Sequence, residues 1–243
     1  MRKEMPRTEK VVAKVNADWT FSFRPRSPFA GGLPPSEDVA KLLMRQLSEP
    51  HVNRKSVLLE LIRLYRSTGR GADALAVAAD YLVECSDVEA RAEVYFHLGQ
   101  AMEHVQDWES AIRWYTQAKE LKPRNRFYRY LIHNNIGYSL NQQHKYSEAE
   151  LILRIAITID PTRANAFKNL GLCFEGQKKS GEAARMYIAA VHADAADPRA
   201  LRHLTELAER HPEIVEEVPN IWHEISKCRE AVEYAARCRW EKQ

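Results

Sequence analysis

The 243-residue sequence contains no uncharged apolar run of about 18 residues, the length that a membrane-spanning helix needs. Its first ten residues, MRKEMPRTEK, lack the apolar core of a secretory signal. Cysteine is sparse and forms no CxxC pair, which excludes a disulfide framework and a structural zinc site. We therefore expect a soluble protein in a reducing compartment, with a cytoplasmic location and no membrane insertion.

Strong charge and catalytic motifs are also missing. Lysine plus arginine number 36 against 33 aspartate plus glutamate, a net charge of +3, which is too small to hold nucleic acid by charge alone. No GxSxG, HExxH or glycine-rich phosphate loop occurs, and the nine histidines are scattered. We expect no enzymatic activity, no catalytic residue, no metal site and no cofactor.

Glycine is scarce too, with nine in the chain, yet three glycines lie inside helical patterns, in FHLGQAM, NNIGYSL and KNLGLCF. A glycine inside a helix costs roughly 1 kcal/mol relative to alanine, so a common cause is expected. Each is followed by an alanine 12 residues later and by another after 7 more. The three sets are Gly99, Ala111 and Ala118; Gly137, Ala149 and Ala156; and Gly171, Ala183 and Ala190.

This pattern resembles the tetratricopeptide repeat, a 34-residue pair of antiparallel helices with small residues at its eighth, twentieth and twenty-seventh positions. Gly137 and Gly171 are 34 residues apart, whereas Gly99 and Gly137 are 38 apart, which indicates four extra residues near 126–129. The resemblance implies an all-α fold, a right-handed superhelix of tandem helix pairs. The small residues are expected where two helices cross too closely for a larger side chain.

The same register divides the chain. The array is expected over 55–212, with units at about 55–88, 92–125, 130–163 and 164–197 and a half unit at 198–212. Residues 1–35 form an irregular, aromatic and proline-rich segment, which we expect to dock on its own array or on a neighbouring copy. Residues 36–54 are expected to hold a short helix and a linker, with Ser36 as the N-cap and Val39, Leu42, Leu43 and Leu47 packed on the first repeat.

The last part of the chain, residues 213–243, is expected to form a capping helix that hides the apolar face of the final unit. Its expected buried residues are Trp222, Ile225, Val232 and Ala235.

The resemblance also implies a concave groove lined by the first helix of each unit. Its inward positions give the candidate peptide-binding residues Phe96, Gln100, Asn134, Asn135, Tyr138, Asn141, Asn165, Lys168 and Asn169. Asn135 and Asn169 occupy the same place in neighbouring units, and an amide that both donates and accepts can hold a ligand's peptide backbone. The alternative is that one of them caps a turn. The family's carboxylate clamp is not expected, because Lys168, Asn135 and Asn169 follow one another in the wrong order.

We therefore predict a protein-protein interaction scaffold or adaptor that holds an extended peptide or a helix of a partner. A first alternative is a self-assembling structural protein, and hence a homo-oligomer, built head to tail or through the N-terminal segment. A second is an RNA-binding repeat protein, suggested by PRNRFYRYLIH at 123–133, where three arginines lie beside three aromatic residues. The near-neutral charge makes nucleic acid an unlikely partner, and we prefer that Asn125 there caps a first helix lengthened by one turn.

Overall fold

The computed structural model describes residues 36–240, and the expected docking of residues 1–35 lies outside that range. The predicted all-α fold is confirmed, since every regular element in this part of the chain is a helix. The helices are α2 (Ser36–Leu47), α3 (Arg54–Ser67), α4 (Gly71–Glu84), α5 (Val88–His104), α6 (Trp108–Glu120), α7 (Arg126–Gln142), α8 (Tyr146–Ile159), α9 (Ala164–Gly176), α10 (Ser180–Ala193), α11 (Arg199–Arg210), α12 (Ile214–Glu217) and α13 (Ile221–Trp240).

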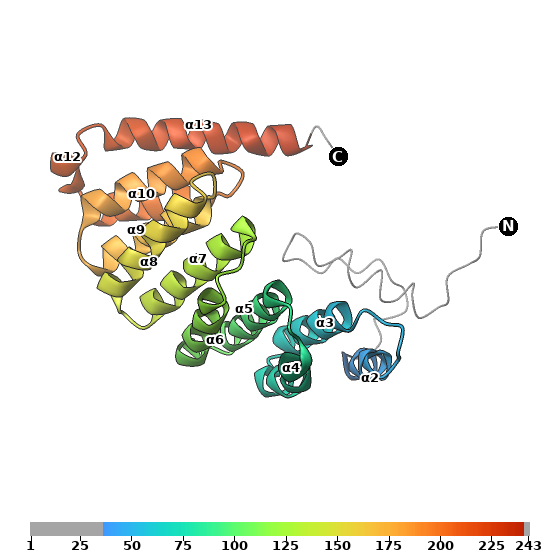
Figure 1. Cartoon of the computed structure of the whole chain (residues 1–243). Helices are drawn as coiled ribbons and strands as arrows, with labels where there is room; N and C mark the ends of the chain where they lie inside the picture. Colours follow the sequence, from blue (N-terminus) through green and yellow to red (C-terminus); the bar gives the residue numbers. More distant parts are fainter. Residues whose placement is uncertain (1–35, 241–243) are drawn as a thin grey trace.

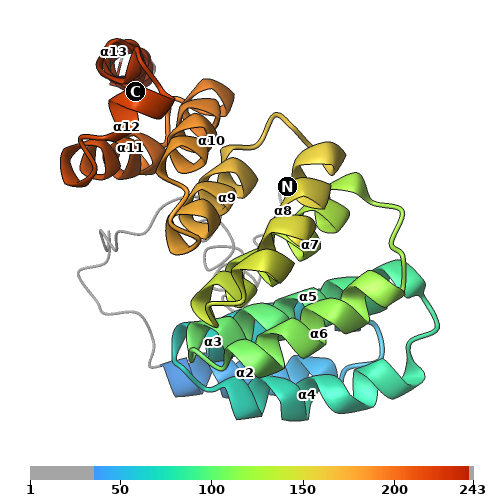
Figure 2. The same ribbon diagram turned by 90° about the vertical axis from the view of Figure 1, so that its left-hand side faces the viewer.

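The helices pair in chain order and stack into a right-handed superhelix with α2 at one end and α13 at the other (Figure 1). Figure 2 shows the two helices of the α5 and α6 pair lying side by side. The first helices of successive pairs, α3, α5, α7 and α9, also contact one another directly. They therefore lie on the side of smaller radius, and we call the surface formed by α3, α5, α7, α9 and α11 the inner face.

The three helical glycines mark the closest approach inside three of the pairs. A Cβ atom added to Gly99 would lie 2.5 Å from the ring of Tyr115, and one added to Gly171 would lie 2.5 Å from the ring of Tyr187. At Gly137 the corresponding neighbour is Leu153, whose Cδ2 would lie 2.6 Å away. The large side chain of the second helix fills the space above each glycine, so the predicted reason for these glycines is confirmed.

The insertion before the unit at 130–163 is one extra turn of helix, as predicted. α7 begins at Arg126, and the Asn125 side chain accepts hydrogen bonds from the backbone N–H groups of Phe127 and Tyr128. Tyr128 packs on Phe96 of the preceding unit, with 5.7 Å between ring centroids. α5 is equally long at 17 residues, a lengthening that the repeat register did not predict.

At the two ends of the array, the structure confirms only some of the predictions made from the sequence. Val39 and Leu43 of α2 are buried against α3, but Ser36 is already the first residue of α2, so the predicted N-cap role was wrong. α13 packs on α10 and α11 as a cap. Its buried side chains are Ile221, Ile225 and Cys228.

Trp222 is 52% exposed, so its predicted burial was wrong. The buried stripe of α13 begins one residue earlier, at Ile221, and the next residue of a helix points about 100° away from it.

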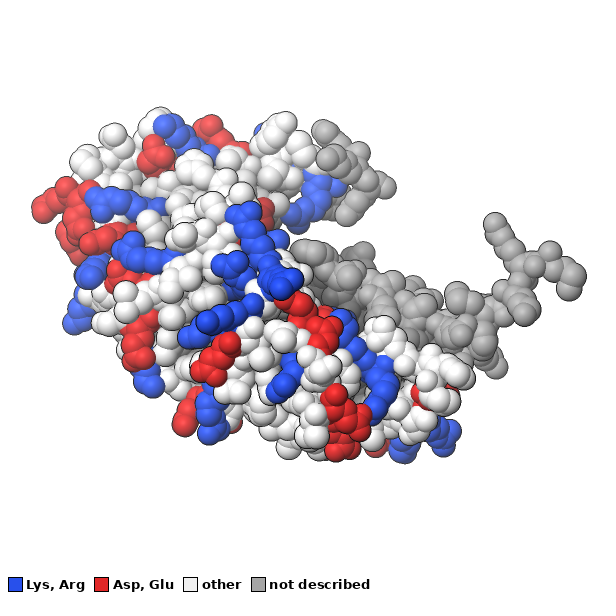
Figure 3. Space-filling model, viewed as in Figure 1, with Lys and Arg blue, Asp and Glu red and all other residues white. Residues whose placement is uncertain are grey.

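The surface carries charges of both signs. Figure 3 shows basic and acidic side chains interspersed over the face seen in Figure 1. Within residues 36–240, none of the helices has both the length and the apolar character needed to cross a bilayer.

Candidate functional site

The structure places the nine candidate residues on the first helices but at different depths. Gln100, Asn135, Tyr138 and Lys168 are partly exposed on the inner face, and Asn165 is exposed. The other four are buried, with 2 to 7% of their surface exposed: Phe96, Asn134, Asn141 and Asn169. Burial of these four argues that they support the inner face from beneath, and the ligand-binding role of all nine residues stays a prediction.

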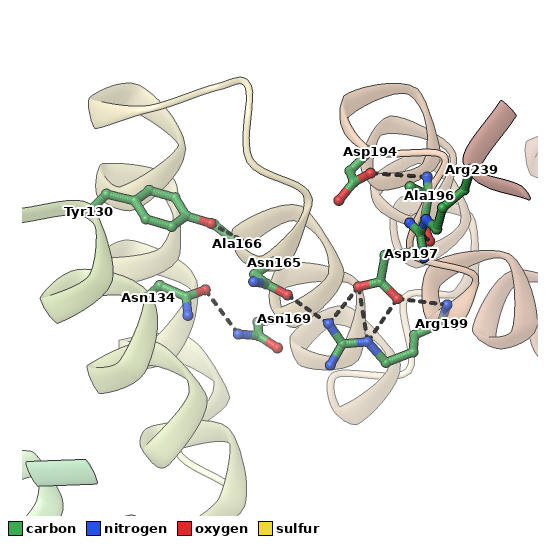
Figure 4. Close-up of polar contacts among 10 residues, drawn as sticks. All are labelled: Tyr130, Asn134, Asn165, Ala166, Asn169, Asp194, Ala196, Asp197, Arg199 and Arg239. Atoms are coloured by element: carbon green, nitrogen blue, oxygen red, sulfur yellow. Dashed lines mark hydrogen bonds and ion pairs between the residues drawn. The ribbon is translucent and has the colours of Figure 1, made fainter. Parts of the chain in front are cut away.

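The predicted asparagine pair is joined through a third asparagine. Asn169 Nδ2 donates to Asn134 Oδ1 at 3.0 Å, as Figure 4 shows, and Asn134 Nδ2 donates to Asn135 Oδ1 at 3.0 Å. Asn135 Nδ2 in turn donates to the Tyr115 hydroxyl, and that hydroxyl donates to Glu103 at 2.6 Å. The chain of hydrogen bonds connects α9, α7, α6 and α5. The amides are therefore used largely to hold successive units in register.

Asn141 serves the same purpose about two turns further along α7, since its Nδ2 donates to the backbone carbonyl of Asn169 at 2.8 Å. Burying an amide costs free energy unless it is hydrogen-bonded, and these partners supply the bonds for all of these amide groups except Asn141 Oδ1, which has no partner within the described residues. The burial of the asparagines and their bonding inside the chain are consistent with each other.

A buried tyrosine and glutamate pair recurs in two units and was not recognised in the sequence. Tyr115 donates to Glu103, and Tyr187 donates to Glu175. Burial raises the pKa of the Tyr115 phenol well above its usual value, and the Glu103 carboxylate raises that pKa further. Burial also raises the pKa of Glu103, although the hydroxyl of Tyr115 opposes the shift. The signal in the sequence is a glutamate twelve residues before a tyrosine in both units.

A pocket of about 490 Å³ opens at the junction of three units. Arg66 comes from the end of α3, Gln100 and Glu103 from the end of α5, Trp108 from the start of α6, and Tyr138 from α7. The Trp108 and Tyr138 rings meet edge to face, with centroids 5.8 Å apart. Gln100 and Tyr138 were candidates from the sequence. Arg66 was missed because no inward positions were assigned in the unit at 55–88, and Trp108 was missed because it lies on a second helix.

The polar groups of this pocket hold one another in place. Arg66 Nη1 donates to Gln100 Oε1 at 2.7 Å, and the same oxygen lies 2.9 Å from His97 Nδ1. Burial lowers the pKa of the Arg66 guanidinium, although the charge of Glu103 partly offsets that effect. The pocket thus combines an aromatic edge with a guanidinium and a carboxylate, and its volume suits a side chain or a small group.

The other end of the inner face carries basic side chains from α9 and α11. Arg199 donates to Asn165 Oδ1 at 3.3 Å and forms an ion pair with Asp197, as Figure 4 shows. Lys168 lies nearby, half-buried, and its pKa falls to about 8 because of burial first and the neighbouring Arg199 second. This end of the face is positively charged.

Comparison with known proteins agrees with this architecture. The model of the tetratricopeptide repeat family matches residues 92–125, which cover most of α5 and all of α6. A search of curated proteins found no match to the sequence. The stacked pairs define a helical-repeat protein of the solenoid type.

Solved structures share this fold at low sequence identity. MamA residues 41 to the end from Desulfovibrio magneticus RS-1 is 18% identical with a TM-score of 0.57, over 76% of this chain and 97% of that one. BtubC (BKLC) from P. vanneervenii is 15% identical with a TM-score of 0.60, over 98% and 93%. A further MamA crystal structure is 19% identical with a TM-score of 0.56, over 79% and 96%. The family model thus matches one repeat unit, and the stacked helix pairs have the fold of tandem tetratricopeptide repeats.

Proposed function

We propose that this protein is a non-enzymatic scaffold that binds an extended peptide or a helix of a partner protein on its inner face. The repeat fold is consistent with a protein-protein interaction scaffold. The observation that carries the proposal is the pocket where Gln100 and Tyr138 meet Arg66 and Trp108. Aromatic and arginine side chains in a concave site are the groups that most often dominate the free energy of a protein interface.

The inner face also offers polar groups along its length. Gln100, Asn135 and Asn165 are each at least partly exposed, and their amides can exchange hydrogen bonds with the backbone of an extended segment. A solenoid presents such groups at regular intervals on a concave surface, which is the geometry that suits an elongated ligand. The buried asparagines contribute by keeping the units in register.

The test uses a library of random 12-residue peptides displayed on phage. We expect the protein to enrich specific peptides and Tyr138→Ala to weaken their affinity by about tenfold or more, since an interface hot spot is worth about 2 kcal/mol. Leu151→Ala, at a 66% exposed residue of α8, is the matched control and should bind as the parent does. Circular dichroism must show that both variants are folded. Equal affinity of the enriched peptides for Tyr138→Ala, or no enrichment at all, would contradict the proposal.

Two further measurements separate the other functions. Light scattering over a range of concentrations should give a constant mass for a scaffold, whereas a mass that grows with concentration would favour head-to-tail self-assembly. The interspersed charges of Figure 3 argue against an RNA-binding surface. Our proposal includes a cytoplasmic location, which the four unpaired cysteines support. Imaging of a fluorescent fusion would test it.

A further inference from the structure

Lys168 stands out among the charged residues of the inner face. It lies on α9, is only partly exposed, and its ammonium forms no hydrogen bond or ion pair with the residues that the structure describes. A half-buried ammonium without a counter-charge is costly, because burial removes water that is not replaced. Its lowered pKa, about 8, has the same cause. An anionic partner would therefore stabilise the charged form of this lysine.

The neighbouring acidic residues do not pair with Lys168, because both already pair with arginines. Asp197 is the acid whose charge favours the Lys168 ammonium, but its carboxylate already accepts from Arg199 Nε at 2.8 Å and from the Arg199 backbone N–H at 3.0 Å. Glu206 lies 3.8 Å from Arg202 in an exposed pair. The basic residues here are Lys168, Arg199 and Arg202. Each of the two acidic residues is paired with an arginine, so the charge of Lys168 has no counter-charge.

We propose that Lys168, with Arg202 beside it, binds the carboxylate of an aspartate or glutamate in the partner segment. The inference deepens the proposed function, on which it rests, by giving the partner an acidic side chain at this end of the inner face. A carboxylate here would form a charge-assisted hydrogen bond with the ammonium in a partly desolvated place, where such a bond is stronger than on an open surface.

The surroundings favour a peptide as the source of the carboxylate. Asn165 Oδ1 accepts from Arg199, which leaves the exposed Asn165 Nδ2 free to donate to a peptide carbonyl one helical turn from Lys168. A nucleic-acid strand would require a basic track, whereas the carboxylates of Asp197 and Glu206 lie among the basic side chains here. One ammonium with an adjacent guanidinium suits one carboxylate.

The arrangement differs from the family's clamp for a terminal carboxylate, whose order of lysine and asparagine is absent here. The charged groups around Lys168 come from the first turn of α11 and from Asp197 just before it, in the last units of the array. The partner's acid is therefore expected inside the bound segment and not only at its end.

The experiment is a double-mutant cycle between the protein and an enriched peptide whose two ends are acetylated and amidated. Replacing the peptide's acidic residue by its amide should weaken binding to the parent by about tenfold, the usual worth of a hydrogen bond to a charged group. With Lys168→Gln the same replacement should change the affinity by less than about twofold. Lys168→Arg should keep most of the difference, and Lys41→Gln, an exposed lysine of α2, should keep all of it.

Each other outcome has a defined meaning. Enriched peptides that lose affinity in Tyr138→Ala but show no dependence on an acid would overturn this inference and leave the proposed function standing. No enriched peptide at all would overturn both. A 12-nucleotide oligo(U) that binds the parent more tightly than the peptides do, and loses that affinity in Lys168→Gln, would assign the site to nucleic acid instead. Thermal melting of Lys168→Gln should match the parent or exceed it, because the variant no longer buries an unpaired ammonium.

Discussion

Gly137 on α7 lies directly beneath Leu153 on α8, at a separation where a Cβ atom on the glycine would come within 2.6 Å of Leu153 Cδ2. Leu153 is fully buried, so it cannot swing away into solvent. We expect Gly137→Leu to overpack the pair and to lower the free energy of unfolding by about 1 to 3 kcal/mol. Urea denaturation measures the change.

Two further variants test the cause of that loss. Gln142→Leu introduces the same residue at an exposed place on the same helix and should stay within about 0.5 kcal/mol of the parent. Leu153→Ala in the Gly137→Leu background should recover part of the lost stability, because the clash partner has been removed. If the two substitutions add independently, the two side chains do not meet as the structure shows.

The hydrogen bond from Asn169 to Asn134 joins α9 to α7 inside the inner face. Asn169→Ala would leave the buried Asn134 Oδ1 without its donor, and we expect a loss of about 1 to 3 kcal/mol in the free energy of unfolding. Asn165→Ala, at an exposed position on the same helix, serves as the control and should cost far less. Equal stabilities of the two variants would show that the asparagine chain does not hold the units together.

The repeat register could be predicted because its cause acts within each unit. Gly99, Gly137 and Gly171 must be small wherever two helices cross closely, so the same residue type returns at a fixed spacing. The burial of Asn134 and Asn141 depends instead on how far the neighbouring unit overlaps α7. A single unit's pattern does not contain that information.

Arg66 and Trp108 illustrate the same limit for the pocket. The pocket forms where three units meet, so its lining includes the end of one helix, the start of another and the middle of a third. Inward positions read from the repeat found Gln100 and Tyr138. Positions next to the turns depend on the path of each turn, and the repeat pattern does not give that path.

Asn125 caps the lengthened helix α7 by accepting from Phe127 N at 2.9 Å and Tyr128 N at 3.3 Å. Asn125→Ala should lower the free energy of unfolding by about 0.5 to 2 kcal/mol, since two helical N–H groups lose their acceptor. Asn125→Asp keeps an acceptor at the same place and should retain most of the stability. Chemical denaturation of the three proteins measures the difference, and equal losses in both variants would show that the cap contributes nothing.

The burial of the His97 imidazole lets us predict how the stability of the array depends on pH. It is 7% exposed, its Nδ1–H donates to Gln100 Oε1 at 2.9 Å, and its Nε2 has no partner within the described residues. Burial first, and then the charge of Arg63, lowers its pKa to about 4. Above pH 6.5 the imidazole is neutral in both the folded and the unfolded chain, so His97 makes no difference there.

Between pH 6.5 and about 4, the unfolded chain binds a proton at this position while the folded chain does not. The stability that the neutral imidazole allows is therefore present above pH 6.5 and is lost as the pH falls through this window. A shift of this size corresponds to about 3 kcal/mol. His97→Gln removes the titrating group, so its free energy of unfolding should fall less than that of the parent between pH 7 and pH 4.

His51 is exposed, and His51→Gln should therefore follow the parent over the whole range. Urea denaturation at several pH values gives the three curves, and subtracting the parent's curve removes the effect of the carboxylates, which titrate in all three proteins. A His97→Gln curve parallel to the parent's would mean that this imidazole is protonated in the folded state. Water would then have to reach Nε2 through the inner face, and the polar network around Gln100 would be open in solution.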